Sequence, residues 1–284
     1  MNNKAPAYLF LFPAFLFLGM FALLPMAQIA YYSFFEDNLI IPKVFVGLEN
    51  YAELVSDRNF WSVLLNSFIY LLVTPVLIII SLTLAIAVRE ETRLNNFFRT
   101  LYFLPVITPL VIAGIMWRWI FTEDTGLLNY LLSLLGIGKV SWLSESPQNM
   151  FSVMILTVWR GFGYYMMIFL AGLALVSREL EEAAELDGAS RLQKVFHIIL
   201  PQLKPSITLV FVISSASALK IFTELYIMIP GSPMANKTLV YYLFTEAFER
   251  FNFGYSSAAG VLLFILTLGF SYANVKISSG AAKE

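Results

Sequence analysis

Long apolar runs are the feature that most limits what this chain can fold into. Four of them contain no charged residue, at 5–35, 61–88, 100–117 and 251–275. Two more are almost free of charge, because the run at 146–177 contains only Arg160 and the run at 205–236 contains only Lys220 and Glu224. About 20 mainly apolar residues in an α-helix span the hydrocarbon core of a bilayer, so each run is long enough to cross it once.

The sequence therefore predicts an all-α, polytopic membrane protein with about six transmembrane helices in a single domain that covers residues 1–284. The expected spans lie at about 7–35, 61–88, 100–121, 149–176, 205–229 and 253–276. The composition agrees, because 13% of the residues are charged, against roughly a quarter in soluble domains. The first apolar run is about twice as long as the core of a signal peptide, so we expect it to be retained.

Several classes of function are disfavoured by what the sequence lacks. The net charge of −1 gives no basic field, so we expect no nucleic-acid partner. The chain contains no cysteine and one histidine, His197, which leaves little for metal or acid–base chemistry. Its Gly138-Lys139 pair does not belong to a phosphate-binding loop, because Ser133 stands where the first glycine should be. We therefore expect no catalytic residue, metal or cofactor in this chain, and any ATP hydrolysis must come from another chain.

The distribution of lysine and arginine predicts the orientation, since loops rich in these residues tend to stay in the cytoplasm. If the N-terminus is inside, ten basic residues are inside: Lys4, Arg89, Arg93, Arg99, Arg178, Arg191, Lys194, Lys204, Lys276 and Lys283. Six are outside: Lys43, Arg58, Arg118, Lys139, Lys237 and Arg250. We therefore expect a multi-pass protein of the cytoplasmic (inner) membrane with both termini in the cytoplasm.

The connections expected outside are long enough to meet an external partner, at about 36–60, 119–147 and 231–252. In the second of them, a leucine-rich stretch after Gly126 is too short to span the membrane. We expect this stretch to form an interfacial helix.

The most charged stretch of the chain lies between the fourth and fifth expected spans, from Ser177 to Pro205. Ser177 with the acidic residues that follow it predicts the start of a short helix, which we expect to end at Gly188. Beyond this glycine, Leu192, Val195, Phe196 and Ile199 recur at helical spacing. They predict a second amphipathic helix that stops at Pro201. On these grounds alone, a solvated connecting loop with some helix remains an alternative.

The order of residues in this stretch resembles the cytoplasmic EAA motif of ABC importer permeases. The matching positions are Glu182, Ala183, Ala184, Asp187, Gly188, Ile198, Leu200 and Pro201. Other segments are similar to the sugar branch of this family, the first permease of maltose and glycerol-phosphate importers. These segments are Gly47-Leu48-Glu49-Asn50-Tyr51, Ala247-Phe248, Phe253-Gly254 and Ala258-Ala259. The chain departs from the branch at Pro230-Gly231-Ser232-Pro233, where the family commonly has Thr-x-Gly-Gly-Pro.

The resemblance implies a type I ABC importer permease fold and a set of partners. These are a second permease subunit, two ATP-binding cassette subunits that bind ATP and Mg²⁺, an extracytoplasmic solute-binding protein, and a sugar, oligosaccharide or polyol as the solute. Residues 177–204 would be the cytoplasmic loop that carries the coupling helix. Closure of the ATPase pair would push on this helix and switch the spans from inward-open to outward-open. Glu182 would face a basic group, Ala183 and Ala184 would allow close approach, and Gly188 would form the turn.

Three charged residues lie inside the expected spans, where each costs about 2.5–3.5 kcal/mol on insertion scales. Lys220 and Glu224 are four residues apart on one expected helix and could pair with each other. In the maltose-type permeases that the chain resembles, the sugar is held by the spans that flank the EAA loop. The expected substrate path is therefore Arg160, Gly161, Tyr164, Ser214, Ser217, Ala218, Lys220, Ile221 and Glu224. For His197 we expect a surface or docking role.

Two alternatives remain open from the sequence. An ABC permease for another solute, such as glycerol phosphate, would use Arg160 and Lys220 as anion contacts. A membrane-embedded enzyme or receptor is a different class of function. An enzyme is disfavoured because the sequence shows no nucleophile, metal-binding cluster or phosphate-binding loop. A receptor is disfavoured because it would not need a motif for docking an ATPase.

Overall fold

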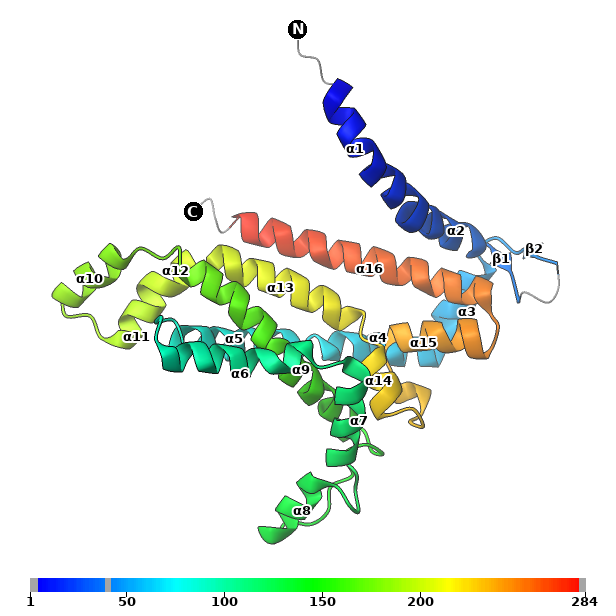
Figure 1. The fold of residues 1–284 in the computed structure, drawn as a ribbon. Helices are drawn as coiled ribbons and strands as arrows, with labels where there is room; N and C mark the ends of the chain where they lie inside the picture. The colour runs from blue at the N-terminus through cyan, green and yellow to red at the C-terminus, as the bar shows by residue number, and fades with distance from the viewer. Residues whose placement is uncertain (1–4, 39–41, 281–284) are drawn as a thin grey trace. The chain divides into compact units, whose positions relative to one another are not determined.

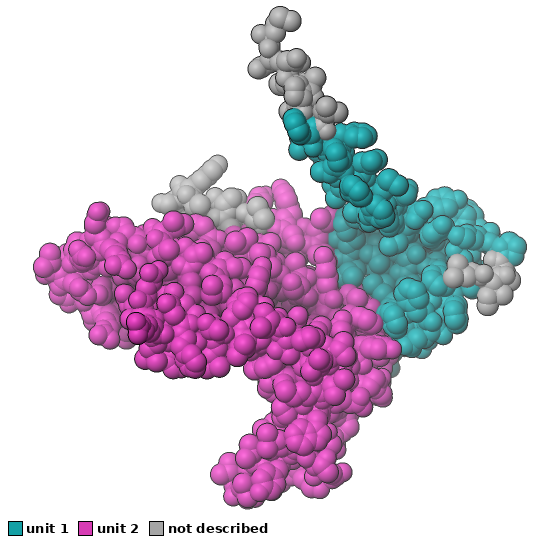
Figure 2. All heavy atoms as spheres, in the orientation of Figure 1, with its two compact units in different colours: residues 1–61, 242–266 teal, residues 62–241, 267–284 magenta. Residues whose placement is uncertain are grey.

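The computed structural model describes residues 5–38 and 42–280, which are mostly helical (Figure 1). Lys4 and Lys283, two of the basic residues used to predict the orientation, lie outside these described residues. The chain forms two compact units, shown in different colours in Figure 2. The first comprises Met1–Trp61 with Tyr242–Leu266, and the second comprises Ser62–Tyr241 with Thr267–Glu284.

The first unit begins with a long apolar helical run and ends with the start of the last helix. Its elements are α1 (Ala5–Leu18), a π-helical segment (Gly19–Leu23), α2 (Leu24–Tyr32), β1 (Phe35–Glu36), β2 (Val44–Phe45), α3 (Glu49–Ser56), the first residues of α4 (Arg58–Tyr70), the last residues of α15 (Leu239–Phe244), a π-helical segment (Thr245–Glu249) and the first half of α16 (Phe253–Gly280). The strands pair antiparallel, with Phe35 opposite Phe45. Side chains of the span Phe10–Tyr32 are not buried within the protein, which suits a helix facing lipid or another subunit.

Hydrogen bonds explain why the Gly-Leu-x-Asn-Tyr sequence follows the first span. The Asn50 side-chain amide donates to the backbone oxygens of Ser33 and Phe35, at 2.9 Å each. The Tyr51 hydroxyl donates to the Ser33 hydroxyl at 2.7 Å. A Cβ on Gly254 would lie 1.8 Å from the Phe35 oxygen, so this approach requires glycine. The motif therefore fixes the end of the first span against α3 and the start of α16.

The second unit contains the remaining helices. They are α5 (Val73–Ala87), α6 (Arg93–Ile107), α7 (Leu110–Ile120), α8 (Leu127–Leu134), α9 (Gln148–Leu173), α10 (Arg178–Leu186), α11 (Arg191–Lys194), a π-helical segment (Val195–Ile199), α12 (Leu200–Gln202), α13 (Lys204–Leu219), α14 (Thr223–Met228) and a 3₁₀ turn (Met234–Asn236). The helix predicted after Gly126 is present as α8. Leu131, Leu134 and Leu135 of this segment are exposed.

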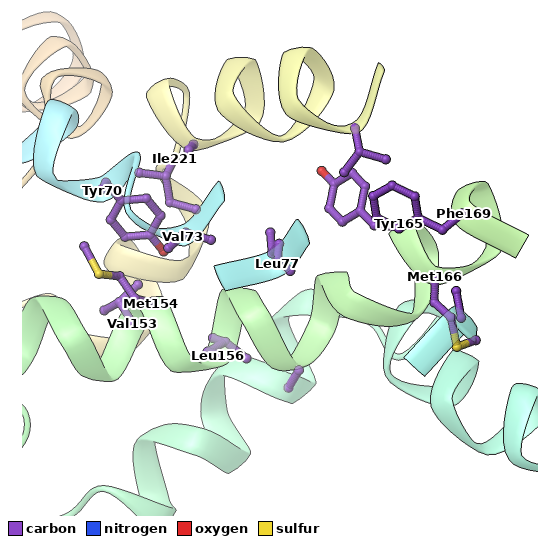
Figure 3. Close-up of a cluster of buried hydrophobic side chains, with 14 of the residues drawn as sticks. Tyr70, Val73, Leu77, Val153, Met154, Leu156, Tyr165, Met166, Phe169 and Ile221 are labelled. Carbon is purple, nitrogen blue, oxygen red and sulfur yellow. The ribbon is translucent and has the colours of Figure 1, made fainter. Parts of the chain in front are cut away.

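The core of the second unit forms around α9. This helix packs against α5, α6, α13 and α14. Figure 3 shows a cluster of its buried side chains, in which Tyr70 and Leu77 lie with Met154, Leu156 and Tyr165 of α9. Each of these five side chains is at most 7% exposed. Because α9 is central, every residue on its inward face is held by several neighbouring helices, which fixes the geometry of any cavity beside it.

The predicted spans agree with the structure in number but differ in shape. Within the described residues, four helices are long and apolar enough to cross a membrane, and six spans result if each of two bent pairs counts as one. The four helices that each form a span alone are Phe10–Tyr32, Arg58–Ala87, Gln148–Leu173 and Phe253–Asn274. The third predicted span, 100–121, is not one continuous helix, because α6 and α7 meet at 94°. Thr108 is extended before Pro109, which removes a backbone donor, and a residue before proline avoids helical geometry.

The fifth predicted span, 205–229, is also interrupted. Helix α13 ends at Leu219 and α14 begins at Thr223. In the break, the Thr238 hydroxyl donates to the Ile221 backbone oxygen at 2.9 Å. This bond supplies a partner that the broken helix no longer provides, which allows non-helical backbone at membrane depth.

Candidate functional site

A cavity of about 340 Å³ lies in the second unit, between α5, α9, α13 and α14. All of the residues expected to form a substrate path line it: Arg160, Gly161, Tyr164, Ser214, Ser217, Ala218, Lys220, Ile221 and Glu224. The cavity also includes Thr157, Tyr165, Phe222 and Thr223, which the sequence reasoning did not single out. Thr157 and Tyr165 lie on the same helix as Arg160 and Tyr164, so the helical spacing would have indicated them.

Arg160 lies near the middle of α9 and reaches the cavity from there. Its Nε atom is buried and has no hydrogen-bond partner in the described part of the chain. Glu224, in the first turn of α14, is 8% exposed and lies close enough to Arg160 to interact with it electrostatically. The ion pairs within 4 Å found among residues 5–38 and 42–280 do not include these two residues.

The suggested pairing of Lys220 with Glu224 is wrong for this structure. It assumed one continuous helix, whereas Lys220 caps the end of α13 and Glu224 belongs to α14. As a result, the described residues show no ion pair between them. Both side chains face the same cavity, which therefore holds two cationic groups and one carboxylate.

Hydroxyl and aromatic groups complete the lining. The Ser214 and Ser217 hydroxyls donate to the backbone oxygens of Val210 and Ile213, at 2.7 and 2.9 Å, and keep lone pairs that can accept. Tyr165 lines the same cavity as these two serines. Tyr164 is 44% exposed and packs edge-to-face on Tyr165, with 5.2 Å between ring centroids. Such a mixture of ring faces and hydroxyls suits a polyhydroxylated ligand.

The loop at 177–204 forms the helix, turn and helix that its sequence predicts. The Ser177 hydroxyl accepts from the Leu180 N–H at the start of α10. Gly188 has a φ of +82°, which a residue with a side chain rarely adopts. A capping box of Ser190 and Gln193, which the sequence reasoning missed, begins α11. The second helix continues through the π-helical segment to Gln202 and does not stop at Pro201, which lies one residue before its end.

Two ion pairs hold this loop in place. Arg89, just after α5, contacts Glu181 of α10 at 2.6 Å. Lys194 of α11 contacts Glu185 of α10 across the turn, and this contact lowers the pKa of the Glu185 carboxyl. Neither Arg89 nor Glu181 belongs to the motif. Their pairing depends on the tertiary structure, so no sequence pattern indicated it.

The surface of the loop is partly apolar although the loop is highly charged. Leu186 is 90% exposed, and Leu192 and Phe196 are exposed as well. Among the motif residues, the exposed side chains are those of Glu182, Ala183, Asp187 and Pro201, and the partly buried ones are Ala184, Ile198 and Leu200. Gly188 lies at the exposed turn. A hollow of about 270 Å³ includes Ala184, Ile198 and His197, whose Nδ1 lies 3.0 Å from the Gln193 oxygen. Exposed apolar side chains gathered on one element are typical of a binding surface.

A larger hollow of about 460 Å³ lies in the first unit, and its lining includes six acidic side chains. Its buried acids already have partners: Asp37 contacts Lys43 at 2.9 Å, and Glu246 contacts Arg250 at 2.6 Å. The pairing with Asp37 raises the pKa of the Lys43 amino group. Among the described residues, no group of His, Asp and Glu side chains could hold a metal ion. We therefore take the cavity beside α9 and the loop at 177–204 as the two candidate sites.

Comparisons with known proteins agree with one another. Residues 77–276 match the family model described as the binding-protein-dependent transport system inner membrane component. The probable ABC transporter permease protein YurN of Bacillus subtilis strain 168 is 34% identical over 290 residues, covering 100% of this chain and 99% of that protein. The arabinooligosaccharides transport system permease protein AraP of the same bacterium is 35% identical over 290 residues, covering 100% of this chain and 91% of that protein.

A solved structure has the same fold. It is a bacterial alginate ABC transporter in complex with an alginate pentasaccharide-bound periplasmic protein. The match has a TM-score of 0.85 with 20% identity and covers 98% of this chain and 95% of that one.

Proposed function

Because this chain belongs to the family of inner membrane components of binding-protein-dependent transport systems, we propose that it is the permease subunit of an ATP-driven importer of a sugar, oligosaccharide or polyol. The observation that carries the solute class is the cavity beside α9, where tyrosine rings, hydroxyls and charged groups meet at membrane depth. The relative AraP, named for arabinooligosaccharides, supports the same class.

The proposed complex contains partner subunits for solute delivery, translocation and ATP hydrolysis. A second permease subunit completes the path, two ATP-binding cassette subunits hydrolyse ATP with Mg²⁺, and an extracytoplasmic binding protein delivers the solute. The alginate ABC transporter, solved in complex with a periplasmic protein, has the same fold and supports the binding-protein partner. In this assembly the chain holds no catalytic residue or cofactor of its own, and both of its termini lie in the cytoplasm.

The loop at 177–204 is the proposed contact with the ATPase. Its exposed Leu186 offers an apolar anchor, and Glu182 beside it offers a negative charge. Movement of α10 would reach the membrane by two routes. The pair Arg89–Glu181 connects α10 to the end of α5, and buried Leu203 connects the second half of the loop to α13. Both α5 and α13 line the cavity, so a push on the loop would change the cavity's shape.

Co-purification of the complex tests this proposal. We expect the affinity-tagged chain, co-expressed with the proposed partner subunits, to retain an ATPase, and Leu186→Glu to lose it. Leu135→Glu is the matched control, because Leu135 is 74% exposed but follows α8 in the connection expected outside. Retention of the ATPase by Leu186→Glu, or its equal loss from both variants, would contradict the proposed docking surface. Recovery of no ATPase with the unmodified chain would contradict the function.

A further inference from the structure

The cavity beside α9 carries an excess of positive charge. Arg160 and Lys220 are cationic and Glu224 is the one acidic residue in the lining, so the formal net charge is +1. Arg160 lies on α9, a helix long and apolar enough to cross a membrane, while Lys220, which is exposed, and Glu224 lie at the break after α13, within the fifth predicted span. Unbalanced charge inside a membrane is expensive. An anionic group that enters the cavity would compensate it.

Arg160 has hydrogen-bonding capacity that the protein does not use. Its Nε is buried, and the guanidinium makes no hydrogen bond or close ion pair within the described residues. A guanidinium presents a planar fork of donors that matches a carboxylate, sulfonate or phosphate with two parallel bonds. An unmatched fork at this depth points to an acceptor that arrives from outside the chain.

Glu224 is not the acceptor that the Arg160 guanidinium lacks. It lies on a separate short helix after the break in the fifth span, within electrostatic range of Arg160 but not within 4 Å of it. Lys220, on the other side of the break, has no close ion pair in the described part of the chain either. Glu224 can therefore offset at most one of the two cations, which leaves one positive charge for a ligand.

We propose that the cavity receives an acidic saccharide, with its anionic group bound by Arg160 and Lys220 and a sugar ring placed against Tyr164. The inference rests on the proposed function, since it names the class of solute for that site. A neutral sugar would accept hydrogen bonds from Arg160, but it would leave the excess charge uncompensated when the cavity closes to water, and a buried uncompensated charge is unfavourable. A solute with one anionic group removes this penalty.

Equilibrium binding to the purified complex in detergent, without the binding protein, tests the inference. The probes are digalacturonate, glucose 6-phosphate and α-1,4-linked digalactose, which is the neutral match of the first. We expect at least one acidic probe to bind about tenfold more tightly than digalactose. The two acidic probes distinguish a uronate from a sugar phosphate as the source of the charge.

Substitutions of cavity residues test whether the preference for acidic probes arises in the cavity. Arg160→Gln and Lys220→Gln should each remove most of the tenfold preference, whereas Lys139→Gln should keep it, because Lys139 lies on an exposed loop and pairs with Asp124. Glu224→Gln should tighten acidic binding, since it removes the competing carboxylate, and it remains informative if an arginine variant does not assemble.

Four outcomes would overturn the inference. They are equal binding of digalactose, an acidic preference that survives in both cation variants, loss of the preference in Glu224→Gln, and no binding of any probe. Each leaves the proposed function standing as long as the ATPase co-purifies, because that test does not depend on the solute's charge. The two failures are therefore distinguishable.

Discussion

Gly188 and Gly254 are glycines for different physical reasons. Gly188 has a φ of +82°, and a Cβ added to it would meet no other atom within 4 Å. A side chain there would cost about 1–2 kcal/mol from the backbone alone. Gly254 has no room, because its Cβ would lie 1.8 Å from the Phe35 oxygen. A substitution at Gly188 should therefore affect the coupling of ATP hydrolysis to transport, and a substitution at Gly254 should affect folding.

Substitution of Gly188 should separate transport from assembly. Gly188→Val forces a β-branched residue into left-handed geometry, whereas Gly188→Asn places there a residue that tolerates it. In proteoliposomes containing the whole complex, we expect Gly188→Val to lose most uptake per ATP hydrolysed and Gly188→Asn to keep most of it. Equal coupling in the two variants would show that the turn's geometry is not required.

Substitution of Gly254 should lower the stability of the chain. Gly254→Ala drives a methyl group into the backbone at Phe35, and overpacking of this kind costs about 1–3 kcal/mol. We expect a lower midpoint of thermal unfolding for the purified protein. Gly138→Ala is the control, because nothing lies within 4 Å of its added Cβ. An unchanged midpoint for Gly254→Ala would contradict the close approach.

At the scale of elements, the ion pair between Arg89 and Glu181 connects the end of α5 with α10. We expect Arg89→Glu to leave ATP hydrolysis largely intact and to reduce uptake several-fold, because the loop would move without α5. The exchange Arg89→Glu with Glu181→Arg should restore uptake, and Arg93→Ala should have little effect, since Arg93 is exposed. Failure of the exchange to restore any uptake would count against this link.

The contact between Lys194 and Glu185 predicts how the loop responds to acid. Lys194 lowers the pKa of the Glu185 carboxyl, so the stabilisation is fully present above the usual carboxyl pKa of 4.5 and is lost as the pH falls through the lowered value. The hydrogen-exchange protection factors of residues 185–194, which correct for the intrinsic pH dependence of exchange, should therefore stay constant near neutral pH and fall below about pH 4. Glu185→Gln should abolish this fall, and a fall of the same size in that variant would contradict the assignment.

Local signals predicted the elements of the loop better than the breaks in the spans. Ser177 and Gly188 act within one helical turn of their own positions, so the helix, turn and helix followed from sequence. The break after Leu219 depends on Thr238, which lies far along the chain, and the pairing of Lys220 with Glu224 was wrong for that reason. Pro109 interrupts the helix locally, but the 94° angle between α6 and α7 depends on how α7 packs against α14 and α9. Most of the cavity residues were named from a resemblance, and Arg160, Lys220 and Glu224 were named because they are charged residues inside expected spans. Their role as a solute path remains a prediction.

For the whole molecule, the absence of cysteine allows a direct test of orientation. Single cysteines at Glu49 and Lys139 should react with an impermeant thiol reagent added to intact cells, while those at Thr92 and Gln193 should react only after the membrane is opened. All four positions are exposed, so accessibility within the fold is matched. The reverse labelling pattern would mean that both termini lie outside.

The two cations and one carboxylate of the cavity also bear on how transport depends on the membrane potential. A solute anion that leaves Arg160 and Lys220 for the cytoplasm moves against an inside-negative voltage. Moving one charge across the whole membrane requires about 2.3 kcal/mol for each 100 mV, and the step from the cavity accounts for part of this. Import of an acidic sugar through this cavity would therefore slow as the membrane hyperpolarises, whereas import of a neutral sugar would not respond. The charge that selects the solute thus also determines how strongly voltage opposes its uptake.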